Sequence, residues 1–86
     1  MLSIRNIQFT KLLRVDGRFR EFNFRKSGKD EQVFFNVDVT DDRNTRIFFR
    51  MQKENSAWKI LPQEIPTWIM NNETNLCELI EKELQS

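Results

Sequence analysis

The chain has 86 residues, of which 38% are hydrophobic and 31% are charged, with only two glycines and two prolines. This composition is typical of a folded globular domain and excludes a disordered or fibrous chain. No apolar run approaches the roughly 20 residues of a membrane span, and the first residues lack the apolar core of a secretory signal. We therefore expect a single domain over residues 1–86, a cytoplasmic location and no membrane contact.

The alternation of apolar and polar residues predicts two strands at the start of the chain. The first begins near residue 4, and one of its faces carries Ile7, Phe9, Leu13 and Val15. It ends at Asp16-Gly17, a dipeptide suited to a type I′ hairpin turn. The chain returns over residues 18–25, with Phe22 and Phe24 on one face, and we expect a second turn at Ser27-Gly28-Lys29-Asp30.

Three further strands are predicted up to residue 61. Residues 32–40 alternate most clearly, with Val33, Phe35, Val37 and Val39 on the apolar side. The turn at residues 41–44 leads into a fourth strand from residue 45, and a short fifth strand follows at residues 57–60, before Pro62. Five strands joined by short polar turns predict an antiparallel meander.

The period of the apolar residues becomes helical after Ile65. Pro66 suits the first turn of a helix, and the predicted helix over about residues 66–84 has an apolar stripe formed by Ile69, Leu76, Cys77, Ile80 and Leu84. Asn71 and Asn72 are poor helix formers. The sequence leaves open whether they divide the segment into a short turn at 66–70 and a longer helix at about 73–84.

These elements predict an α+β fold. A sheet with one apolar face must cover that face, and the C-terminal helix is the element left to do so. Trp58 and Trp68 are expected where the sheet meets the helix, because each ring can bury roughly 150 to 250 Å².

The opposite parity of the strands predicts a candidate contact surface on the other face of the sheet. Its aromatic and apolar members lie among arginines, and the set comprises Leu12, Arg14, Phe19, Arg25, Phe34, Arg46, Phe48 and Arg50. Several exposed apolar residues on adjacent strands form a patch of the kind that marks a contact surface.

Three structural interpretations compete with a binding role for this surface. A β-bulge near Glu21 would return Phe19 to the core side of the sheet. Strong curvature would let Phe34 and Phe48 bury each other under arginine stems. A symmetric dimer, formed face to face or edge to edge, would hide the patch between two copies.

The mixture of rings and arginines also suits single-stranded nucleic acid, because rings stack on bases and guanidinium groups contact phosphates. The order of strands and a C-terminal helix resembles the topology of the whirly and purine-rich-element-binding proteins, which bind single-stranded nucleic acid, usually as dimers or repeats. Glu21 and Asp38 on the same face, and a net charge of only +1, weigh against this ligand. Charge is uneven, however, since residues 1–53 carry twelve Lys/Arg and seven Asp/Glu, whereas residues 54–86 carry two and six.

The residue types argue against an enzyme. The chain has no histidine, which removes the commonest general base and zinc ligand, and it has no tyrosine. Cys77, the single cysteine, is expected to be an inert thiol on the helix stripe and excludes an internal disulfide. The acidic residues Asp38, Asp41 and Asp42 lack the loop of an EF-hand, and no glycine-rich phosphate motif is present. We therefore predict no catalytic residue, metal, cofactor or small-molecule substrate.

The function predicted from the sequence is that of a small non-enzymatic binding or self-association module that uses the exposed face of its sheet. A protein partner or a homodimer is favoured over nucleic acid. Single-stranded nucleic-acid binding through the phenylalanines and arginines of that face is the alternative.

Overall fold

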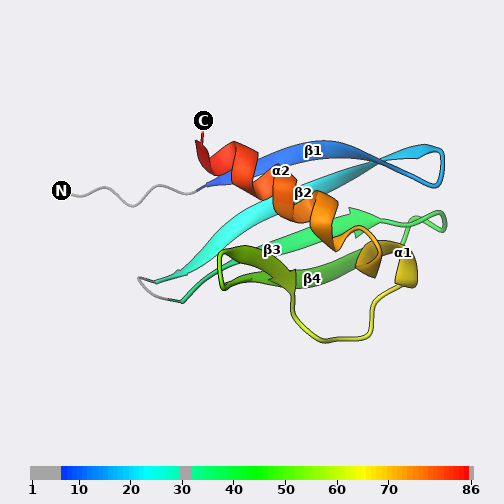
Figure 1. The fold of residues 1–86 in the computed structure, drawn as a ribbon. Coiled ribbons are helices and arrows are strands. Elements are labelled where there is room, and N and C mark those ends of the chain that lie inside the picture. The colour runs from blue at the N-terminus through cyan, green and yellow to red at the C-terminus, as the bar shows by residue number, and fades with distance from the viewer. Residues whose placement is uncertain (1–6, 30–31, 86) are drawn as a thin grey trace.

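The computed structural model describes residues 7–29 and 32–85 of the chain (Figure 1). The strands are β1 (Gln8–Val15), β2 (Arg18–Lys29), β3 (Gln32–Thr40), β4 (Arg46–Glu54) and β5 (Ala57–Ile60). The helices are α1 (Thr67–Met70) and α2 (Glu73–Gln85). The predicted strand residues 4–6 and the predicted turn residue Asp30 lie outside the described residues.

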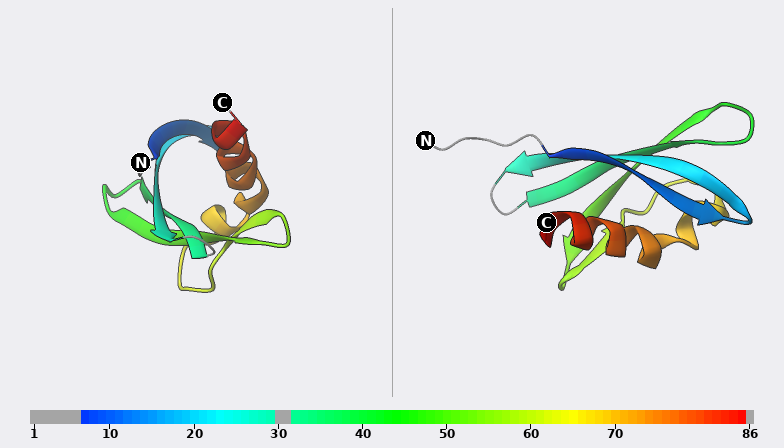
Figure 2. Two further views of the ribbon diagram at one scale, coloured as in Figure 1. Left: turned by 90° about the vertical axis from the view of Figure 1, so that its left-hand side faces the viewer. Right: turned by 90° about the horizontal axis from the view of Figure 1, so that it is seen from above.

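The strands form one antiparallel sheet in the order β1-β2-β3-β4-β5, which confirms the predicted meander and the α+β class. The sheet is strongly curled, and α2 lies across the opening of the curl (Figure 2). Each strand therefore has an inner face, toward α2, and an outer face directed away from it. Neither helix in the described ranges is long and apolar enough to cross a membrane.

Two of the connections are tight hairpin turns with positive φ angles. Asp16 and Gly17 have φ of 51° and 80°, which confirms the predicted type I′ turn. Asn55 and Ser56 have φ of 51° and 75° and join β4 to β5 in the same way. Both turns match the right-handed twist of the strands that they connect.

The turn expected at Ser27-Gly28-Lys29-Asp30 was placed too early. β2 continues through Lys29, and Gly28 lies inside the strand opposite Val33 of β3, with φ of 102°. The pairing of β2 with β3 extends to Lys29 and Gln32, so it includes the residues that turn composition had indicated as a loop. Hydrogen bonding along the paired strands prevailed over the local turn preference of serine and glycine.

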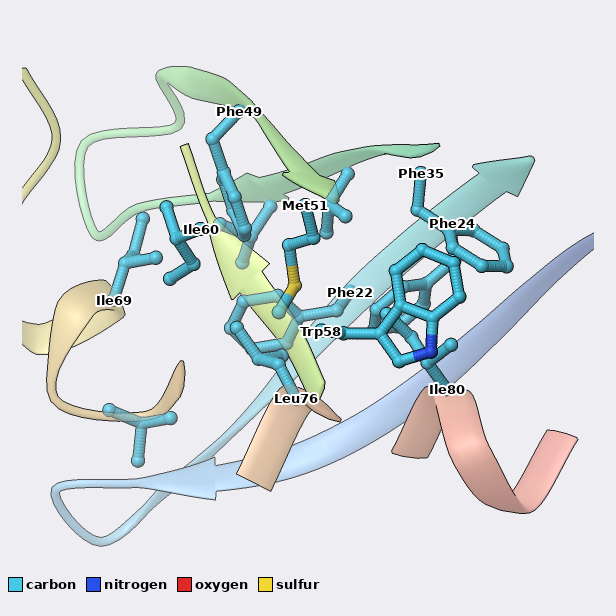
Figure 3. Close-up of a cluster of buried hydrophobic side chains, with 13 residues drawn as sticks. Phe22, Phe24, Phe35, Phe49, Met51, Trp58, Ile60, Ile69, Leu76 and Ile80 are labelled. Atoms are coloured by element: carbon cyan, nitrogen blue, oxygen red, sulfur yellow. The ribbon is translucent and has the colours of Figure 1, made fainter. Parts of the chain in front are cut away.

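The hydrophobic core lies between the inner face of the sheet and the helices (Figure 3). Its fully buried side chains come from β2, β3, β4, α1 and α2, and they are Phe22, Phe24, Phe35, Val37, Val39, Met51, Ile69, Leu76 and Ile80. Trp58 is buried among them, and its ring meets that of Phe35 edge to face at 5.0 Å. Trp68 is half-buried and meets Phe22 edge to face at 6.5 Å.

The two asparagines do divide the helical segment. The side chain of Asn72 donates to the carbonyl of Trp68 (2.7 Å) at the end of α1, and its own carbonyl accepts from the N–H of Leu76 (2.9 Å) at the start of α2. The predicted apolar stripe of the helix is wrong at Leu84, which is 39% exposed. Leu84 lies in the last turn of α2, and a straight helix contacts a curled sheet over only part of its length.

Side chains of α2 bond to the outer edge of β5. The N–H of Trp58 donates to Sγ of Cys77 (3.3 Å), and the N–H of Ile60 donates to Oε2 of Glu73 (2.8 Å). Successive N–H groups of a strand point to alternate sides. Because the N–H of Leu61 bonds to the carbonyl of Arg50 in β4, the N–H groups of Trp58 and Ile60 point away from β4. The helix therefore covers the inner face and also satisfies the exposed edge of the last strand.

Replacing Glu73 with alanine tests this edge contact. Glu73→Ala leaves the N–H of Ile60 without its acceptor, and we expect the free energy of unfolding to fall by about 1 to 3 kcal/mol. Glu78→Ala, on the exposed side of the same helix, should change it by less than about 0.5 kcal/mol. Urea unfolding of both variants measures the difference, and equal stabilities would show that the edge contact contributes nothing.

Candidate functional site

The outer face of the sheet carries large apolar side chains that remain exposed. Phe19 is 69%, Phe48 64% and Leu12 61% exposed, whereas Phe34 is half-buried. The pairing of β1 with β2 is continuous and places Phe19 opposite Arg14, so the proposed bulge near Glu21 is absent. Of Phe34 and Phe48, burial under an arginine applies to Phe34, because Cζ of Arg50 lies 4.5 Å from its ring centre. No arginine of the described residues covers Phe48 in this way.

These residues do not form one continuous apolar patch. A row of polar side chains crosses the sheet and ends at Phe48: Oγ1 of Thr10 donates to Oδ1 of Asn23 (2.6 Å), Nδ2 of Asn23 donates to Oδ1 of Asp38 (3.0 Å), and Asp38 lies opposite Phe48 on β4. The candidate surface therefore has two parts, with polar residues of β2 and β3 between them. Leu12, Arg14 and Phe19 lie over β1 and β2 near their turn, whereas Phe48 lies on β4 between Arg46 and Arg50, with Arg25 on β2 opposite Asn36.

Phe48 stands between two hollows of the surface. The first has a volume of about 410 Å³ and is lined by Thr10, Asn23, Asp38 and Arg46, among others. The second has a volume of about 600 Å³ and is lined by Arg50, Leu61, Pro62 and Gln63, among others. Arg25, Asn36 and Phe48 line both. We call these residues and hollows together the Phe48 site.

The second hollow has a wall that belongs to a loop. The N–H of Leu61 bonds to the carbonyl of Arg50 (2.9 Å), and Nε2 of Gln63 donates to the carbonyl of Phe48 (3.0 Å). Pro62 turns the backbone away from β4 between these two contacts. The side chain of Gln63 thus donates to the next outward carbonyl of β4 after that of Arg50, and it holds the loop beside the ring of Phe48.

The charges of the Phe48 site are predominantly positive. The single carboxylate among its lining residues, Asp38, accepts a hydrogen bond from Asn23 and lies 3.6 Å from Nε of Arg46. Nε of Arg50 donates to Oδ1 of Asn36 (3.1 Å), which leaves its terminal amino groups available. The side chain of Arg25 makes no hydrogen bond or ion pair with any other residue that the structure describes. The site therefore offers guanidinium donors around an exposed ring.

The acidic residues considered as a metal site serve separate purposes. Oδ1 of Asp41 accepts from the N–H groups of Arg43 (2.9 Å) and Thr45 (2.8 Å) and so holds the β3–β4 turn. Oδ1 of Asp42 pairs with Arg18 (2.7 Å) and Arg20 (2.9 Å). Within residues 7–29 and 32–85, no three His, Cys, Asp or Glu side chains come close enough to hold a metal ion.

Part of the Phe48 site could not be anticipated from periodicity. Asn23 and Asn36 alternate with the core residues of their own strands, as Phe48 does on its strand, so alternation places all three on the outer face. The wall formed by Leu61, Pro62 and Gln63 has no such signal, because it depends on where the loop after β5 crosses β4.

Comparison with known protein families, curated proteins and solved structures finds no match to this chain. The topological resemblance to single-stranded nucleic-acid-binding modules gains no support from these comparisons. Evidence for a function therefore comes from the residues of the outer face.

Two adjacent phenylalanines of β4 allow a direct test of which ring contributes to the free energy of unfolding. Phe48 is exposed and Phe49 is buried, at 64% and 3% exposure. We expect Phe49→Ala to lower the free energy of unfolding by about 3 to 5 kcal/mol. Phe48→Ala should lower it by less than about 0.5 kcal/mol. Urea unfolding measures both, and a loss near 3 kcal/mol for Phe48→Ala would assign its ring a structural role.

Proposed function

We propose that the protein is a non-enzymatic binding module, and that the Phe48 site on its outer sheet face takes up single-stranded nucleic acid. The observation that carries the proposal is an exposed ring between two hollows, with Arg46 and Arg50 two residues away on either side along β4. The absence of histidine and tyrosine from the sequence supports a role without catalysis.

The chemistry of the Phe48 site suits this ligand. A base can stack on the ring of Phe48, because every base has an aromatic face. Arg46 and Arg50 lie about 13 Å apart along an extended strand, from a rise of roughly 3.3 Å per residue, and each has donors for a phosphate on its own side of the ring. The amide of Asn36 and the carboxylate of Asp38 provide hydrogen-bonding partners for a base edge.

The arrangement of apolar residues supports a polar ligand over a dry protein interface at this site. The cores of stable protein interfaces are apolar and poor in charge. Phe48 instead has Asp38 directly opposite it on β3 and arginines two residues away on its own strand. A second sheet packed face to face here would have to bury these charged groups, at a high desolvation cost.

The distribution of charge favours approach of a polyanion by the outer face. The four arginines predicted on that face belong to β1, β2 and β4. α2, on the opposite side of the sheet, carries Glu73, Glu78, Glu81 and Glu83. Repulsion from the helix and attraction by the arginines would together orient the ligand.

Titration of isotope-labelled protein with a short mixed-sequence single-stranded DNA tests the proposal. At low salt we expect amide shifts around Arg46, Phe48, Arg50 and Gln63, and we expect them to vanish at high salt because binding releases counterions. The absence of shifts at low salt would contradict nucleic-acid binding and leave a protein segment as the candidate ligand of this face.

Variants of the site separate stacking from charge. Phe48→Ala should weaken DNA binding roughly 5- to 150-fold, because stacking contributes roughly 1 to 3 kcal/mol per base. Arg46→Gln and Arg50→Gln should each reduce the slope of log K against log salt by about 0.7. Phe19→Ala and Arg18→Gln are matched controls, because neither residue lines a hollow. Equal losses in the controls would mean that binding is not centred on Phe48.

A further inference from the structure

Among residues 7–29 and 32–85, no strand pairs with the outward backbone edge of β1. The N–H of Lys26 donates to the carbonyl of Ile7 (2.8 Å), which makes these residues a hydrogen-bonded pair. The register is continuous from Gln8 opposite Arg25 to Val15 opposite Arg18. The odd-numbered residues of β1 therefore exchange hydrogen bonds with β2, and the even-numbered residues direct their N–H and C=O groups to the other side.

The two edges of the sheet differ in how they are satisfied. At β5, Cys77 and Glu73 of α2 accept from the outward N–H groups of Trp58 and Ile60. At β1, the helix contributes an ion pair between side chains, Lys11 Nζ to Glu83 Oε1 at 3.3 Å. No residue in the described part of the chain bonds to the outward backbone groups of Thr10, Leu12 or Arg14.

Apolar side chains flank this free edge on both faces of the sheet. Leu12 is 61% exposed on the outer face, and Phe19 of β2, at 69%, is its diagonal neighbour in the β1–β2 register. On the inner face Phe9 and Leu13 are only half-buried, although they pack against the core. An added strand would cover residues of both faces and also supply the missing hydrogen bonds.

We propose that β1 pairs with β1 of a second copy of this chain, in antiparallel orientation about a two-fold axis. A two-fold axis perpendicular to the sheet presents the same edge from both copies, with strands of equal length running in opposite directions. The two sheets then become one continuous sheet, with both outer faces on the same side. The first hollow of the Phe48 site reaches Thr10 of β1, but Leu12 and Phe19 line neither hollow, and the inference does not depend on the proposed function.

An axis at Leu12, near the middle of β1, is compatible with the charges of the strand. With the axis at Leu12, the two Leu12 side chains lie opposite each other, Thr10 lies opposite Arg14 of the second copy, and Lys11 opposite its Leu13. No like charges are opposed in this register. Moving the axis to Lys11 would oppose two lysines, which destabilises a strand pair.

Amide hydrogen exchange of the unmodified protein, followed residue by residue against concentration, tests this pairing. We expect the amides of Thr10, Leu12 and Arg14 to exchange at least about tenfold more slowly in concentrated than in dilute protein, in step with dimer formation by sedimentation. The amides of Lys11 and Leu13, which bond to β2, should be protected at both concentrations. A monomer at all concentrations, or a dimer in which the three even-numbered amides stay unprotected, would overturn the proposal.

A charge at the axis supplies an independent test. Leu12→Lys removes the central apolar contact and opposes two positive charges, so the dimer dissociation constant should rise at least about tenfold. Phe48→Ala, on the same face but away from the edge, should leave it unchanged. A Leu12→Lys protein that is folded by circular dichroism and dimerises as tightly as the parent would refute the β1 pairing. If Phe48→Ala loses DNA binding while its dimer dissociation constant is unchanged, then dimer formation and DNA binding use different residues, and failure of one proposal can be told from failure of the other.

Discussion

The packing of α2 against one face of a single sheet is the constraint on which the rest of the structure depends. A chain of this length can build one core, and its five strands have two faces. Leu76 and Ile80 of α2 cover the inner face, and Glu73 and Cys77 satisfy the edge of β5. Neither helix in the described part of the chain covers the outer face or bonds to the backbone edge of β1, so both remain available for contacts.

The outer face is organised by polar contacts between strands. The bonds that join Thr10, Asn23 and Asp38 form a polar row that ends opposite Phe48, and the same carboxylate lies beside Arg46. This arrangement satisfies Asp38 within the sheet, whereas the guanidinium groups of Arg25 and Arg50 have no carboxylate partner among the described residues. The isolated ring of Phe48 is thus better suited to stack on a flat, charged polymer than to pack into an apolar interface.

The two proposals assign different contacts to different parts of the candidate surface. The Phe48 site extends from β4 across the sheet to Thr10 of β1, whereas Leu12 and Phe19 lie nearer the β1–β2 turn and line neither hollow. Pairing through β1 would place two Phe48 sites on one side of a continuous sheet. Two linked sites on one strand of nucleic acid would bind more tightly than either alone, provided that the strand can span both.

The sequence by itself determined which side chains share a face, because alternation along a strand and the helical period follow from backbone geometry alone. It determined the Asp16-Gly17 turn and the face of β4 on which Phe48 lies, but it left open whether that ring is exposed and whether the helix divides at Asn71-Asn72. Tertiary structure alone decided that β2 continues through Gly28, that Leu84 is left outside the core, and that Leu61–Gln63 forms a wall beside Phe48. It also decided which edge of the sheet stays open, since hydrogen bonds between strands and the path of the chain over the sheet depend on residues far apart in sequence.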